Sequence, residues 1–181
     1  MQATGARTLY CEHFLYPPIY DIAKGREWAV QAQQPLKGSA KTIDFIFFRP
    51  RRGKREAGLV FLEVKYLTGI NPSQECKRLG EDFQKLKEVS AERLKDADEA
   101  SKCGPGSKFV LVVGQHNDLQ AIAKKSPRKY QNVVALLRAS LKDKSPKTVY
   151  RSIVETKLKS ELHWNVIAIG ERAWQRGIVS K

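Results

Sequence analysis

The chain has 181 residues, of which 33 are lysine or arginine and 19 are aspartate or glutamate, giving a formal net charge of +14 at pH 7. This length suits one domain over residues 1–181, and no apolar run approaches the roughly 20 residues needed to span a bilayer. The excess of positive charge predicts attraction to a polyanion, most commonly nucleic acid. A ribosome-associated or membrane-surface protein could show the same balance, but we expect no membrane partner. The N-terminal residues lack the apolar core of a signal peptide, and the three cysteines are widely spaced. We therefore expect a cytoplasmic protein without a disulfide framework or a zinc site.

The spacing of apolar residues predicts alternating helices and strands. Helical spacing over residues 7–24 predicts a first helix that Pro17 and Pro18 kink or break. Strand patterns follow over residues 27–34, 41–48 and 58–67, and the later elements are a helix over 73–95, a strand over 107–115, helices over 129–141 and 148–162, and a last strand over 164–170. The helix over 73–95 carries an apolar stripe formed by Cys76, Leu79, Phe83, Leu86 and Val89. This order predicts an α/β domain with a mixed central sheet and a hairpin inside it.

Two of the predicted strands carry charges among apolar residues. Glu63 and Lys65 in GLVFLEVKYL point to the same face of their strand, about 7 Å apart. Asp44 lies in TIDFIFF, where an acidic residue is disfavoured. Burying such groups without a partner or a metal costs several kcal/mol, on the order of 2–7 kcal/mol even for a neutral polar group. Charges facing water at the edge of the sheet remain the alternative.

The expected hairpin brings these acids together. A turn at Gly53 and Lys54 pairs Arg52 with Arg55 and, counting outward, Asp44 with Glu63. Directly opposed Cβ atoms lie about 4.5–5.5 Å apart, so the two carboxylates would repel unless a cation lay between them. A divalent metal fulfils this role, and oxygen ligands of this kind suit Mg²⁺.

The pattern resembles the PD-(D/E)XK nuclease superfamily. The matching residues are Asp44 and Glu63-Val64-Lys65, with Ile43 in place of the family's proline. The predicted order from residue 7 to about 115 resembles the family's α-β-β-β-α-β restriction-endonuclease-like core, and residues 116–181 would form a C-terminal extension of helices and a last strand.

The resemblance implies a site and a reaction. It implies metal-dependent phosphodiester hydrolysis with Mg²⁺ or Mn²⁺, in which Asp44, Glu63 and Lys65 are the catalytic residues. The implied metal ligands are Asp44, Glu63, the carbonyl of Val64 and a glutamate of the first helix. Glu12 is the candidate by position, with a solvated helix residue as its alternative, and Glu27 is its rival.

The basic residues of the hairpin supply candidate phosphate contacts. The predicted nucleic-acid-binding residues are Arg49, Arg51, Arg52, Lys54 and Arg55 at the hairpin tip, and Lys85 on the following helix. A solvated basic loop is the alternative for the tip, and Asp82 with Lys85 also suits an ordinary surface pair on a helix. Gln84 is a further polar candidate on that helix.

Three functions are compatible with this sequence. The first is a nuclease that acts on DNA rather than RNA, as a homodimer or within a larger nucleoprotein complex on family analogy. The second is a non-catalytic nucleic-acid-binding or assembly subunit that retains the fold. A basic structural protein, such as a ribosome-associated factor, would explain the charge but not Asp44 within an apolar strand.

Overall fold

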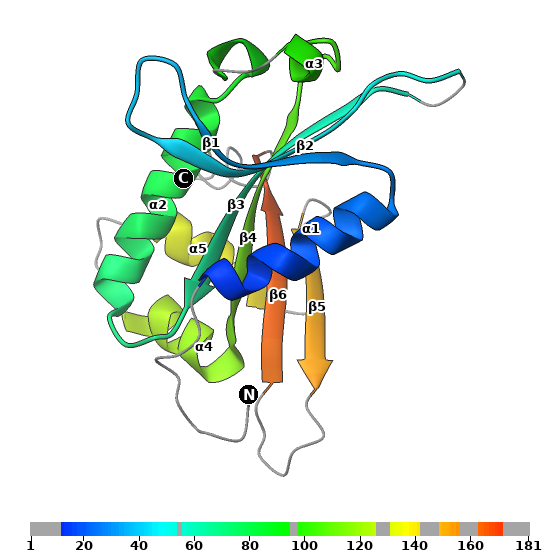
Figure 1. Cartoon of the computed structure of the whole chain (residues 1–181). Coiled ribbons are helices and arrows are strands. Elements are labelled where there is room, and N and C mark those ends of the chain that lie inside the picture. Colours follow the sequence, from blue (N-terminus) through cyan, green and yellow to red (C-terminus); the bar gives the residue numbers. More distant parts are fainter. Residues whose placement is uncertain are drawn as a thin grey trace.

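The computed structural model describes residues 12–53, 56–94, 98–125, 131–141, 149–155 and 163–171. Six strands form one mixed sheet in the order β1-β2-β3-β4-β6-β5 (Figure 1). They are β1 (Ala29–Pro35), β2 (Thr42–Arg49), β3 (Gly58–Leu67), β4 (Ser107–Gln115), β5 (Val149–Glu155) and β6 (His163–Gly170). Only β3 and β4 pair in parallel among these neighbours. The α/β class and the mixed sheet are therefore confirmed.

Helices cover the two faces of the sheet unequally. The described helices are α1 (Tyr16–Gly25), α2 (Pro72–Glu88), α3 (Asp98–Ser101), α4 (His116–Lys125) and α5 (Gln131–Leu141). Apolar residues of α2, α4 and α5 share one core with the sheet, whereas α1 crosses the opposite face and contacts β1 (Figure 1). Within the described ranges, no helix is both long and apolar enough to cross a membrane.

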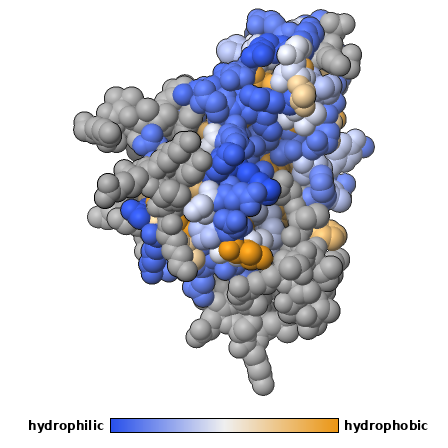
Figure 2. Space-filling model, turned by 90° about the vertical axis from the view of Figure 1, so that its left-hand side faces the viewer, coloured by the Kyte–Doolittle hydropathy of each residue, from blue (hydrophilic) through white to orange (hydrophobic). Residues whose placement is uncertain are grey.

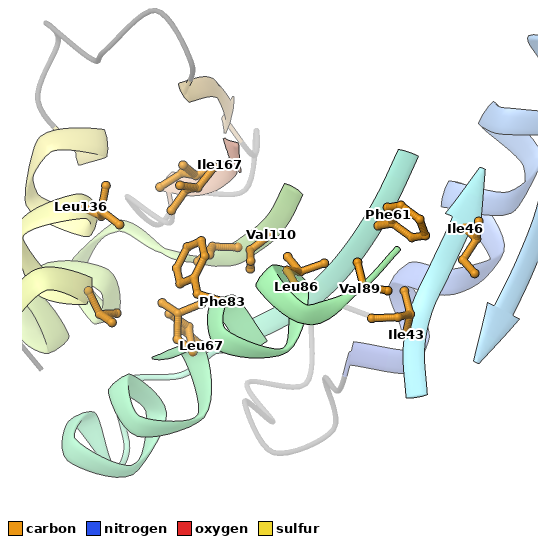
Figure 3. Close-up of a cluster of buried hydrophobic side chains, with 14 of the residues drawn as sticks. Ile43, Ile46, Phe61, Leu67, Phe83, Leu86, Val89, Val110, Leu136 and Ile167 are labelled. Carbon is orange, nitrogen blue, oxygen red and sulfur yellow. The ribbon is translucent and has the colours of Figure 1, made fainter. Parts of the chain in front are cut away.

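Helix α2 is fixed by its N-terminus and its apolar face. Pro72 occupies the first turn, and the Asn71 side chain accepts a hydrogen bond from the backbone N–H of Gln74 at 3.2 Å. The predicted apolar stripe is confirmed, because Cys76, Leu79, Phe83, Leu86 and Val89 are all buried. Figure 3 shows Leu86 and Val89 of this region close to Ile43 and Phe61 of the sheet. Figure 2 shows that the outer surface on the side of the molecule that carries α2 is largely hydrophilic, in contrast to the buried face of the helix.

The hairpin register follows the prediction. Strands β2 and β3 pair from Phe45↔Leu62 to Arg49↔Gly58, the register that continues to Asp44 opposite Glu63. Gly53 has a φ of 58°, a left-handed conformation that glycine adopts without a steric penalty. Between β1 and β2 the ladder is interrupted at Gln33, which has a φ of 51°. The interruption lies beside Asp44.

Two predictions about elements are wrong. Pro17 and Pro18 do not break a helix; they occupy the first turn of α1. Backbone N–H groups in that turn have no acceptor within the helix, so a proline there costs no hydrogen bond. The helix predicted over 148–162 is instead strand β5 where it is described, because β6 provides a neighbour for its backbone hydrogen bonds. Residues 7–11 and 156–162 lie outside the described residues.

Two further differences from the prediction concern helices. The helix predicted over 73–95 ends at Glu88, and a 3₁₀ turn follows at Ala91–Arg93. Helix α4 was not predicted, since it starts directly after β4 and the nearest glycine, Gly114, lies inside the strand.

Candidate active site

Asp44 links β2 to β3 through its side chain. Its Oδ2 accepts a hydrogen bond from the backbone N–H of Val64 at 2.8 Å. Its Oδ1 accepts hydrogen bonds from the Tyr16 hydroxyl at 2.6 Å and from Gln33 Nε2 at 2.9 Å. Donors from α1, β1 and β3 therefore hold the carboxylate in one orientation. Hydrogen bonds to an ionised acceptor are the strong ones, which makes this arrangement rigid.

Glu63 is the most deeply buried acidic residue of the site, with 1% of its surface exposed. Its Oε2 lies 2.5 Å from Lys85 Nζ, and the same ammonium donates to the Thr42 carbonyl at 2.9 Å. Its Oε1 is buried and has no hydrogen-bond partner among the described residues. The pKa of Glu63 is raised to about 8, chiefly by burial and also by the nearby Asp44, while Lys85 opposes the rise.

Asp82 connects the two lysines of the site. Its Oδ2 lies 3.0 Å from Lys65 Nζ, and its Oδ1 lies 3.7 Å from Lys85 Nζ. Burial raises the pKa of Asp82, and Lys65 and Lys85 oppose the rise. Glu63, Lys85, Asp82 and Lys65 thus form a chain of alternating charges between β3 and α2, called here the charged cluster. Asp44 lies beside it and increases its negative charge.

The structure brings together most of the predicted site residues. Glu63, Lys65 and Lys85 belong to the charged cluster, and the backbone of Val64 bonds to Asp44. Lys65 forms its ion pair with Asp82 of α2. The interpretation of Asp82 and Lys85 as an ordinary surface pair is wrong, because their side chains are only 12% and 15% exposed.

Two residues, Glu12 and Glu27, were candidates for the glutamate expected from the first helix. Glu12 begins a 3₁₀ turn (Glu12–Leu15) that contacts β3, but its side chain lies outside what the structure describes. The rival Glu27 does not begin the first strand. It lies in the exposed turn between α1 and β1, with a φ of 61°.

The donor atoms of Asp44 and Glu63 fit a hard cation. A carboxylate offers about four lone-pair positions. After the hydrogen bonds above, Asp44 Oδ2 retains one of these positions, and Glu63 Oε1 retains both of its own. Within the described part of the chain, no three histidine, cysteine, aspartate or glutamate side chains are arranged to hold a metal ion. A cation here would take its other ligands from the backbone, water or phosphate, as Mg²⁺ commonly does.

Three residues of the site were not assigned to it from the sequence. Asp82 could have been found, since it follows Leu79 by three residues and precedes Leu86 by four, which places it on the buried face of α2. Tyr16 and Gln33 carry no such signal. Their roles depend on α1 and β1 meeting at Asp44, which is a tertiary contact.

The hairpin arginines lie at the other end of β2 and β3. Arg51 and Arg52 are exposed, whereas Arg49 is partly buried with its guanidinium 4.9 Å from the centre of the Trp28 ring. Lys54 and Arg55 lie outside the described residues. The predicted phosphate contacts at the tip are therefore separate from the charged cluster, and Lys85 alone of that group belongs to it.

No protein-family model, curated protein or solved structure matches the chain. Its function therefore has to be inferred from the arrangement of its own residues.

Proposed function

We propose that the chain is a divalent-metal-dependent nuclease of the PD-(D/E)XK type, acting on phosphodiester bonds in DNA. One observation carries the proposal: the register of β2 and β3 leads to Asp44 opposite Glu63, with Lys65 two residues further, and no described residue bonds to Oε1 of the buried Glu63. The order α1-β1-β2-β3-α2-β4 supports the restriction-endonuclease-like core, and the net charge of +14 supports a polyanionic substrate.

The metal ligands would be Asp44, Glu63 and the carbonyl of Val64. In a strand, the N–H and C=O of one residue face the same neighbour, so the carbonyl of Val64 faces the edge where its N–H meets Asp44. When bound, Mg²⁺ or Mn²⁺ would polarise the phosphate and lower the pKa of a bound water. Glu12 remains a candidate ligand on its position in the chain.

The protein's own side chains have distinct roles in this proposal. Tyr16 and Gln33 fix the orientation of Asp44. Lys85 compensates the charge of Glu63 and holds that carboxylate between β3 and α2. Lys65 is oriented by Asp82, and its ammonium would donate to a phosphate oxygen or to the attacking water.

A second candidate function is a nucleic-acid-binding or assembly subunit without catalysis. It is favoured by one contact, the direct ion pair of Lys85 with Glu63, in which a cation of the protein itself already compensates the carboxylate. The protein would then retain the positive charge and the fold but not the reaction.

Cleavage assays separate the two functions. Supercoiled plasmid, a four-way DNA junction and single-stranded RNA would each be incubated with Mg²⁺, Mn²⁺ or EDTA. The variants are Asp44→Asn and Glu63→Gln, and Glu81→Gln on the exposed face of α2 is the matched control. We expect metal-dependent cutting of DNA that falls to the EDTA background in both site variants and persists in the control. Salt-sensitive binding without cutting in every variant would favour the second candidate.

A further inference from the structure

We propose that the outer part of the β2–β3 hairpin, residues 49–53 and 56–58, inserts into the major groove of double-stranded DNA. This segment is called here the ribbon. The proposal rests on the proposed function for the class of polyanion, and it extends that function by naming a DNA duplex as the substrate and by assigning its recognition to one element.

The ribbon begins where the β2–β3 ladder ends, and its two described halves run side by side (Figure 1). The pairing of β1 with β2 stops at Ala29↔Phe48, and the pairing of β3 with β4 starts only at Val60↔Ser107. The β2–β3 ladder continues past both points to Arg49↔Gly58. Beyond these points neither edge pairs with a third strand of the described chain, and Figure 1 shows the hairpin projecting away from the rest of the sheet.

The base of the ribbon is anchored by Trp28. A Cβ added to Gly58 would lie 2.6 Å from Trp28 Cη2, so the indole rests directly on the backbone there, and glycine alone leaves room for it. Arg49, the partner of Gly58 across the ladder, stacks its guanidinium on the same indole. This packing fixes the direction in which the ribbon leaves the sheet.

The charge of the ribbon suits a groove lined by phosphates. Its eight described residues include three arginines and one glutamate, and the two residues that join its halves in the sequence, Lys54 and Arg55, are also basic. Among the described ones, Arg51 and Arg52 are exposed and lie beyond the anchored base. Their guanidinium groups can bond phosphates bidentately, and they can also bond guanine O6 and N7 at the floor of the major groove.

The shape of the ribbon distinguishes DNA from RNA. The major groove of B-form DNA is about 12 Å wide and admits a two-stranded β-ribbon. That of A-form RNA is too deep and narrow for protein side chains to read. Arg52 lies eight residues from Asp44 along the chain, at most about 26 Å. This is about eight base pairs of a duplex, so one DNA molecule could contact both the ribbon and the charged cluster.

The test measures binding without the reaction. Fluorescence anisotropy in EDTA would compare a DNA duplex of about 20 base pairs, two turns of helix, with single-stranded DNA and with an RNA duplex of the same sequence. The variant is Arg51→Ala with Arg52→Ala. The matched control is Lys77→Ala with Arg78→Ala, which removes the same charge from exposed positions of α2. Circular dichroism would establish that both variants fold.

We expect the ribbon variant to bind the DNA duplex about tenfold more weakly and with a salt slope lower by about two, because each lost phosphate contact changes the slope by about 0.9. The control and the RNA duplex should show much smaller changes. Dimethyl sulfate should methylate guanine N7 less in the complex of the unaltered protein and fully in that of the variant.

Two results would overturn the proposal while leaving the nuclease intact. One is equal loss of affinity for duplex DNA, single-stranded DNA and duplex RNA, which indicates general electrostatic attraction. The other is unprotected guanine N7 with normal binding and cutting. Absence of both DNA binding and cutting in the unaltered protein would instead overturn the proposed function itself.

Discussion

The charged cluster and the ribbon use the same kinds of side chain in opposite environments. In the cluster, every charge lies within 2.5–3.7 Å of an opposite charge and is largely removed from water. In the ribbon, Arg51 and Arg52 face solvent. Burial makes electrostatic interactions stronger and unpaired charges costly, whereas exposed charges act through long-range attraction that salt weakens. The cluster should therefore determine stability and site geometry, and the ribbon should determine association with nucleic acid.

The largest effect on stability is expected from Lys85→Met. Lys85 is the ammonium within ion-pair distance of Glu63 in the described chain, and above pH 8, where Glu63 is ionised, its removal leaves a buried carboxylate without compensation. Breaking a buried ion pair in this way costs about 3–5 kcal/mol. Urea unfolding followed by circular dichroism would measure the change in the free energy of unfolding.

Lys77→Met on the same helix is the control. Lys77 is exposed and only 3.8 Å from the equally exposed Glu81, so its replacement should cost at most about 0.5 kcal/mol. Adding Glu63→Gln to Lys85→Met should recover part of the loss, because the uncompensated charge is removed. Equal effects of the two methionine variants would mean that burial does not set the importance of these charges.

The second prediction concerns pH. The pKa of Glu63 rises from 4.5 in the unfolded chain to about 8 in the folded protein, so the folded state binds a proton that the unfolded state releases between these values. The contribution of Glu63 to stability is therefore fully present below pH 4.5 and is lost as the pH rises through 8. The loss is on the order of a few kcal/mol over this range.

Unfolding in urea at a series of pH values would test this sign. Glu63→Gln cannot ionise, so its stability should fall less steeply with rising pH than that of the unaltered protein. Asp82, whose pKa is also raised, would leave a remaining slope of the same sign in the variant. Parallel curves for the two proteins would contradict the prediction.

A smaller effect is expected at the edge of the cluster. Tyr16→Phe removes one of the two donors to Asp44 Oδ1, and the Gln33 amide at 2.9 Å remains. A hydrogen bond to a charged group contributes about 1.5–3 kcal/mol, so we expect a loss near the lower value. Tyr20→Phe, on the exposed side of α1, should change stability little. If both variants unfold like the unaltered protein, Val64 and Gln33 alone would hold Asp44.

Local rules predicted the hairpin well and its surroundings poorly. The register of β2 and β3 was predictable because Gly53 marks the turn and each strand keeps its apolar pattern. The α2 stripe followed from helical spacing for the same reason. The strand β5 was not predictable, since its apolar residues also suit a helix and only its pairing with β6 decides between them.

The site shows the same division between local and tertiary information. Asp44, Glu63 and Lys65 stood out because each is a charged residue in an apolar strand. The partners that position them come from elsewhere, since Tyr16 lies 28 residues from Asp44, and Lys85 reaches the Thr42 carbonyl across 43 residues. Lys85 could be placed on the helix after the motif, but its contact with Glu63 depends on how α2 crosses the sheet.

The smallest effect on stability, and one of opposite sign, is expected from Arg51→Ala with Arg52→Ala. These exposed arginines belong to a chain with a net charge of +14, so removing them reduces repulsion within the folded protein. We expect stability to rise by at most about 0.5 kcal/mol in dilute buffer. The gain should vanish near 1 M salt, where the Debye length is only about 3 Å. The loss in Lys85→Met should persist there, because the charged cluster is largely removed from solvent. Urea unfolding of both variants at low and high salt would therefore separate the two regions, and a gain that survived high salt would place the ribbon arginines among the structural charges.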